Sequence, residues 1–101
     1  MNDAKCDLKL YAQFRQRRST YLCVSVSNSG GSGAHLQEVY RLVASAMDVV
    51  SRSTVKCEPA SMCVTATQRT PRPEGIVLRV IDKLEGAGYT VTRVNRSGKR
   101  L

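Results

Sequence analysis

Residues 8–27 read L-K-L-Y-A-Q-F-R-Q-R-R-S-T-Y-L-C-V-S-V-S. From Leu8 to Arg15, apolar side chains alternate with polar ones, which is the pattern of a strand with one buried face. The alternation resumes from Thr20 to Ser27, where leucine and valine again occupy every second position. The two runs are separated by a short polar stretch, so they predict a β-hairpin around Arg17 and Arg18.

Two helical patterns follow the predicted hairpin. From His35 to Arg52, apolar residues recur at intervals of three and four, which predicts an amphipathic helix of about four turns. The second helix begins within T-P-R-P-E, residues 70–74, because proline suits the first helical position and Glu74 suits the positive end of the helix dipole. Gly86 or Gly88 ends this helix. Its buried stripe is predicted to comprise Val77, Val80, Ile81 and Leu84.

Between the helices, two short β-prone runs flank E-P-A-S, residues 58–61, whose proline at the second position is typical of a type I turn. This turn predicts that Glu58 lies opposite Ser61, and it places Cys57 and Cys63 on opposite faces of the sheet. Such a placement disfavours a disulfide between these two cysteines. A last strand is predicted from Tyr89 to Val94.

The predicted fold class follows from the order of these elements. From Thr20 onward they read βαββαβ, whose simplest form is an α+β, ferredoxin-like sandwich with two helices on one face of an antiparallel sheet. The run at 8–15 is then an extra N-terminal strand. A chain of 101 residues suits one domain, 1–101. Residues 95–101 lack apolar periodicity and predict a flexible basic tail.

The sheet face away from the helices is predicted to be open and polar. Alternation assigns to it Tyr11, Gln13, Arg15, Tyr21, Cys23, Ser25, Cys63, Thr65 and Thr67. A face of this kind suits RNA, because single-stranded bases stack on aromatic rings while cations hold the phosphate backbone. Tyr11 and Tyr21 are the stacking candidates.

Charge gives the strongest functional indication. The chain carries 16 basic and 8 acidic residues, a formal net charge of +8. The excess lies in two groups, one comprising Arg15, Arg17 and Arg18 and the other comprising Arg93, Arg96, Lys99 and Arg100. The groups approach each other if the first and last strands lie near one sheet edge. We therefore expect a nucleic-acid-binding module that acts mainly through phosphate contacts, with RNA favoured over DNA.

Two resemblances to known families bear on this expectation. The βαββαβ order, with T-Y-L-C-V-S-V-S-N at residues 20–28, resembles the RNA recognition motif. That family carries aromatic residues where this chain has M-C-V-T-A-T-Q at 62–68, so its base-stacking residues are not carried over. The segment R-P-E-G-I-V-L-R-V-I-D-K-L-E-G-A-G-Y-T-V, residues 72–91, is similar to a helix-to-strand unit of the GTP cyclohydrolase feedback regulatory protein family, which implies an oligomeric regulatory subunit.

Other classes of function are disfavoured. No serine or cysteine has histidine support at a recognised spacing, so we predict no enzyme and no catalytic residues. The four cysteines lack a C-x-x-C pair, and His35 is the sole histidine, so neither a metal site nor a cofactor is predicted. The polar N-terminus predicts an intracellular protein, cytoplasmic or nuclear, with free thiols and no membrane partner.

The alternative function is a non-enzymatic protein-interaction or regulatory subunit. It would assemble through the open sheet face or an edge strand, as a homo-oligomer such as a dimer or on another protein. An apolar stripe on the first helix wider than one small sheet covers would favour this alternative.

Overall fold

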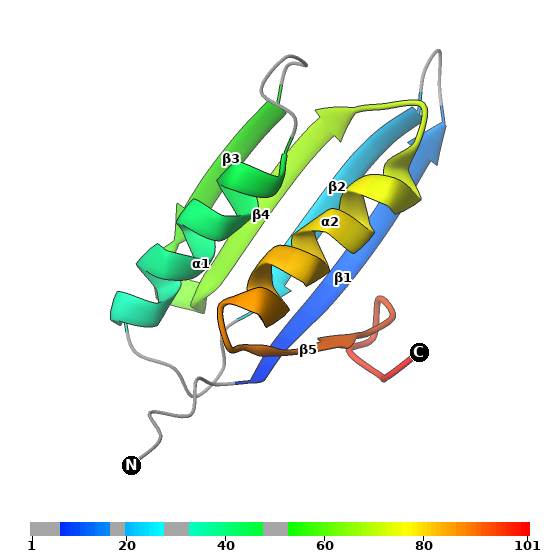
Figure 1. Ribbon diagram of the computed structural model, residues 1–101. Helices are drawn as coiled ribbons and strands as arrows, with labels where there is room; N and C mark the ends of the chain where they lie inside the picture. The colour runs from blue at the N-terminus through cyan, green and yellow to red at the C-terminus, as the bar shows by residue number, and fades with distance from the viewer. Residues whose placement is uncertain (1–6, 17–19, 28–32, 48–52) are drawn as a thin grey trace.

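The computed structural model describes residues 7–16, 20–27, 33–47 and 53–101 (Figure 1). The elements are β1 (Asp7–Gln16), β2 (Thr20–Ser27), α1 (Gly33–Ala46), β3 (Ser53–Glu58), a short 3-10 turn (Pro59–Ser61), β4 (Cys63–Arg69), α2 (Pro73–Gly86) and β5 (Thr90–Arg93). One five-stranded sheet has the order β3-β4-β2-β1-β5, and both helices pack on the same face of it (Figure 1). The predicted α+β fold with two helices on one face is confirmed.

The order of the strands differs from the prediction. β1 and β2 form the expected antiparallel hairpin, with Lys9 opposite Ser27 and Gln16 opposite Thr20. β1 thereby occupies the side of β2 that the last strand takes in a ferredoxin-like sheet, and β5 pairs with β1 in parallel instead. A strand joined by a short connection loses little chain entropy on pairing, so the hairpin takes this position. The sheet is therefore mixed, and the ferredoxin-like order is not found.

The core lies between the sheet and the helix pair. Cross-strand register places Val24 between Ala12 and Ala66, and Val26 between Leu10 and Val64, so one face of three adjacent strands is apolar. Full burial of each leucine or valine side chain contributes about 1.5 to 3 kcal/mol. The fully buried core residues include Leu8, Leu10, Leu22, Val24, Val26, Val39, Val43, Val64, Val77, Val80 and Leu84.

The apolar stripe of α1 is used within the molecule. Leu36, Val39 and Val43 are buried, and Tyr40 and Leu42 pack against the core. The described part of this helix therefore exposes no large apolar side chain, so it offers no apolar surface that would favour self-assembly. α1 begins two residues before His35 and ends at Ala46, whereas the predicted end at Arg52 falls outside the described residues.

α2 follows the sequence signals closely. Arg72 is its N-cap, Pro73 is its first residue and Glu74 lies in its first turn. The helix ends at Gly86, and Gly88 then adopts a φ of 102°, a conformation that glycine reaches without steric cost. The predicted stripe is buried at Val77, Val80 and Leu84, partly buried at Ile81, and extended by Ile76.

The connection between β3 and β4 shifts the predicted register by two residues. Glu58 lies opposite Cys63 instead of Ser61, because Pro59–Ser61 form a 3-10 turn and Met62 closes it with a left-handed φ of 51°. A shift of two preserves the face of every side chain, since strands have a period of two. Cys57 and Cys63 therefore point to opposite faces, as predicted.

Candidate nucleic-acid interface

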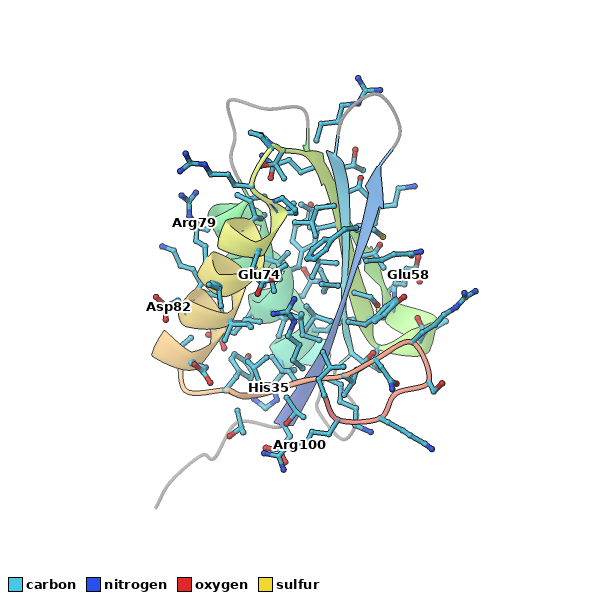
Figure 2. The ribbon with its side chains drawn as sticks, turned by 90° about the vertical axis from the view of Figure 1, so that its right-hand side faces the viewer. His35, Glu58, Glu74, Arg79, Asp82 and Arg100 are labelled. Carbon is cyan, nitrogen blue, oxygen red and sulfur yellow. The ribbon has the colours of Figure 1, made fainter. Side chains whose placement is uncertain are left out.

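The face of the sheet away from the helices, called the open face below, is polar across four strands. Its rows join Lys9 to Ser27, Tyr11 to Ser25 and Gln13 to Cys23. β2 continues these rows into β4, and β4 continues them into β3, where Lys56 lies opposite Thr65 and Thr54 opposite Thr67. Figure 2 shows Glu58 on this side, away from the helices. The predicted assignment of the open face is confirmed for the residues whose side chains the structure describes.

Hydroxyl and thiol groups line the middle of the open face. Ser25 Oγ and Cys63 Sγ share a hydrogen bond of 3.0 Å, and Cys63 is only 8% exposed. Cys23 and Cys57 are half-buried free thiols on opposite faces, and Cys6 lies outside the described residues. The middle of the open face can thus accept and donate hydrogen bonds.

One end of the open face is rich in arginine. Arg15 in β1, Tyr21 in β2 and Arg69 in β4 form a single cross-strand row. Arg72 follows three residues after Arg69, at the start of α2, and both side chains are exposed. We call the positions Arg15, Arg69 and Arg72 the arginine end. The ends of β1 and β4 and the start of α2 lie together in Figure 1.

The structure describes only part of the predicted binding set at this end. It gives the backbone of Arg15 and Tyr21 but not their side chains, and Arg17 and Arg18 lie outside the described residues. Tyr11 is half-buried on the open face, two rows from Arg15. Its ring is therefore placed where a base stacked on the sheet would lie.

Arg69 and Arg72 were missed by the sequence reasoning, which selected basic residues by their clustering in the sequence. Neither forms an ion pair with any residue that the structure describes. The signal that identifies Arg69 is its alternation with Thr65 and Thr67 along β4, which places it on the open face. Arg72 is marked only by its position beside the proline that starts α2.

The second predicted group of cations lies elsewhere. β5 is next to β1, which was the condition for the two groups to approach each other, but Arg93 is level with Leu10, five residues before Arg15. At about 3.3 Å per residue, this separates the two positions by about 16 Å along the strand. The first and last strands are neighbours, yet their arginines do not share a row.

Arg93 is engaged in a bidentate ion pair. Its Nη1 and Nη2 atoms donate to the two carboxylate oxygens of Glu74 at 2.5 and 2.7 Å. These hydrogen bonds lower the pKa of Glu74 and raise that of Arg93. Arg93 therefore joins β5 to the first turn of α2, and a phosphate would have to compete with Glu74 for it.

Residues 94–101 form a tight hairpin. Asn95 Oδ1 accepts hydrogen bonds from the backbone N–H groups of Ser97 and Lys99, at 2.9 and 3.0 Å, and Val94 bridges to Arg100. The mobility predicted for 95–101 stays a prediction, since a hairpin can move as a unit. Arg96, Lys99 and Arg100 are exposed, and Figure 2 shows Arg100 near the lower end of the molecule, away from the arginine end.

Comparisons with protein-family models, with curated proteins and with solved structures find no match to this chain. Within the described part of the chain, no cluster of three or more histidine, cysteine or acidic side chains is arranged to hold a metal ion. Neither described helix is long and apolar enough to cross a membrane.

Proposed function

We propose that this protein is a non-enzymatic nucleic-acid-binding module, with RNA favoured, that holds the phosphate backbone at the arginine end of the open face. The observation that supports this most is the row formed by Arg15, Tyr21 and Arg69, which continues the polar open face to its basic end. Phosphate contacts position a nucleic acid, whereas base contacts specify its sequence.

The open face has a basic end and an acidic end. Arg69 lies at one end, and the exposed acids Asp7 and Glu58 lie at the start of β1 and the end of β3, which is the opposite end. A polyanion is attracted to the first end and repelled from the second. Lys56 lies between them, in the row of Thr65, whereas Lys9 shares the row of Glu58 and partly offsets its charge.

The middle of the open face suits single-stranded bases. Tyr11, Ser25 and Thr65 occupy one continuous cross-strand row, which offers an aromatic ring and hydroxyl groups at the surface of the sheet. A base can stack on the ring, and the hydroxyl groups can pair with its edge or with a ribose 2′-OH. The proposed preference for RNA rests on this row.

The test compares two arginines of equal charge. Arg69→Ala removes a cation from the arginine end, whereas Arg79→Ala removes an exposed cation from the outer side of α2 (Figure 2). Binding of labelled single-stranded RNA, single-stranded DNA and duplex RNA is measured by fluorescence anisotropy over a range of salt concentrations. Arg69→Ala should weaken binding similarly for all sequences and reduce the salt slope by up to about one unit, and Arg79→Ala should do neither.

A third variant, Tyr11→Ala, separates stacking from charge. It should weaken single-stranded RNA binding by about tenfold without changing the salt slope, because stacking on an aromatic ring is worth about 1 to 3 kcal/mol per base. Absence of binding by the unmodified protein at low salt would refute the proposed function. Equal losses for Arg69→Ala and Arg79→Ala would refute the location of the site.

A further inference from the structure

Half of β1 lacks a strand on its outer side. β5 pairs with β1 only from Asp7 to Leu10, and the Val94 N–H then donates to the Leu10 carbonyl oxygen at 2.9 Å. Beyond this point, no strand in the described part of the chain pairs with the outer side of β1, which continues to Gln16. The inner side of the same segment is fully paired with β2.

The backbone groups on this free side can be assigned. The Leu10 carbonyl points outward, and backbone N–H and C=O groups alternate in direction from one residue to the next along a strand. Ala12, Phe14 and Gln16 therefore direct both of their backbone polar groups outward. None of these N–H and C=O groups forms a hydrogen bond with the backbone of a described residue.

An apolar side chain accompanies the free edge. Phe14 is 45% exposed although it shares the helix-facing row of Leu22. Natural sheets protect an edge with proline, with bulges or with inward-pointing charges, and β1 has none of these from Ala12 to Phe14. A free edge with an exposed aromatic ring beside it is the arrangement that accepts an added strand.

Charge indicates which kind of strand fits. The hairpin that follows Val94 begins level with Leu10 and carries Arg96, Lys99 and Arg100 at one end of the free edge. Arg15 lies near the other end of this edge. The nearby carboxylate of Glu74 is neutralised by Arg93.

A second copy of this chain fits poorly. Antiparallel pairing of two β1 edges would bring Arg15 of one copy toward the basic hairpin of the other, and like charges that are close together oppose association. An acidic segment has the complementary charge.

We propose that the outer edge of β1, from Ala12 to Gln16, binds an extended acidic segment of a partner protein, which adds to the sheet as a sixth strand. Its backbone pairs with Ala12, Phe14 and Gln16, one of its apolar side chains covers Phe14, and its carboxylates lie between Arg15 and the basic hairpin. This inference shares Arg15 with the proposed function, but it uses the backbone edge of β1, whereas the proposed function uses the open face of the sheet.

The test uses two synthetic peptides in which glutamate and valine alternate, one unmodified and one N-methylated at every second residue. The methyl groups remove hydrogen-bond donors from one edge of the peptide but leave its charge unchanged. In ¹H–¹⁵N NMR titrations, the unmodified peptide should shift the amide signals of Ala12 and Phe14 and slow their exchange with solvent. The methylated peptide should bind at least about tenfold more weakly, because several hydrogen bonds are lost.

Two neighbouring substitutions provide the matched control. Phe14→Thr removes the exposed ring and keeps a residue favoured in strands. It should lower the affinity of the protein for the unmodified peptide by about tenfold. Gln13→Thr changes the adjacent residue on the open face and should leave the affinity unchanged. Equal binding of both peptides would overturn the proposal, because charge alone would then explain it. Dimerisation of the protein through Ala12 and Phe14 would overturn it by showing that a second copy occupies this edge.

Discussion

The ion pair between Glu74 and Arg93 should contribute measurably to stability, and glutamine at position 74 tests this. The two side chains are 50% and 29% exposed, so solvent screens the pair substantially. The geometry is bidentate, however, and it joins two elements that are distant in the sequence. We expect Glu74→Gln to lower the free energy of unfolding by about 0.5 to 1 kcal/mol. For a domain of this size the melting temperature should fall by about 2 to 6 °C.

The effect should depend on pH in a defined direction. Arg93 lowers the pKa of Glu74 in the folded state, so the carboxylate form stabilises the fold. This stabilisation is complete above the pKa of the unfolded chain, near 4.3, and is lost as the pH falls through the lower folded-state pKa. The melting temperatures of the unmodified protein and of Glu74→Gln should therefore differ at pH 7 and converge by about pH 3.

The assay is thermal unfolding followed by circular dichroism across this pH range. A double-mutant cycle with Arg93→Met, which keeps most of the aliphatic stem, isolates the coupling between the two side chains. Equal melting temperatures at pH 7, or a difference that persists unchanged at pH 3, would show that the pair does not stabilise the fold as described.

Three further predictions concern a turn, the core and the basic hairpin. Met62→Val should lower the free energy of unfolding by more than about 1 kcal/mol in urea titrations, because a β-branched residue fits the left-handed φ of 51° poorly, whereas Met62→Gly should change it little. Leu10→Ala should cost about 2 to 5 kcal/mol in the same titrations, since Leu10 is fully buried. Alanine at Arg96, Lys99 and Arg100 together should leave the melting temperature nearly unchanged and weaken nucleic-acid binding less than Arg69→Ala does, because this hairpin lies away from the arginine end. A loss of affinity and salt slope larger than that of Arg69→Ala would place the main phosphate contacts on the hairpin instead.

Alternation in the sequence was sufficient to predict the two faces of the sheet. Leu22, Val24 and Val26 face the helices, and Cys23 and Ser25 face away, because a strand has a period of two whatever its neighbours are. The start of α2 could also be predicted from the sequence, because Pro73 and Glu74 act through local backbone geometry and charge. Features set by residues close in the sequence were predicted well.

The strand order was predicted wrongly, because it depends on which side of each strand is already paired. A strand has two sides for pairing, and β2 uses one for β4 and the other for its hairpin partner β1. The predicted hairpin was therefore incompatible with a ferredoxin-like place for β5, although each expectation was reasonable alone. The predicted β3–β4 register was also wrong, because no pattern in the sequence indicates that Met62 adopts a left-handed conformation.

The candidate site could be predicted only in part from the sequence, for the same reason. Arg93 was predicted to contact phosphate because of its basic neighbours in the sequence, but Glu74, which pairs with it, lies 19 residues away along the chain. Arg69 stands apart from the other arginines in the sequence and joins the row of Arg15 only when β2 brings the two strands together. The grouping of these charges is a property of the sheet order.

The parallel pairing of β1 with β5 also constrains how the chain folds during synthesis. β1 is the first described element to leave the ribosome, and its partner is the last. Until Thr90–Arg93 emerges, β1 has no strand along its outer side, and Leu8 and Leu10 lack their β5 neighbours. Contacts between such distant segments close slowly. Ribosome-bound chains arrested before Thr90 should therefore interact with chaperones more strongly than chains arrested with β5 outside the exit tunnel.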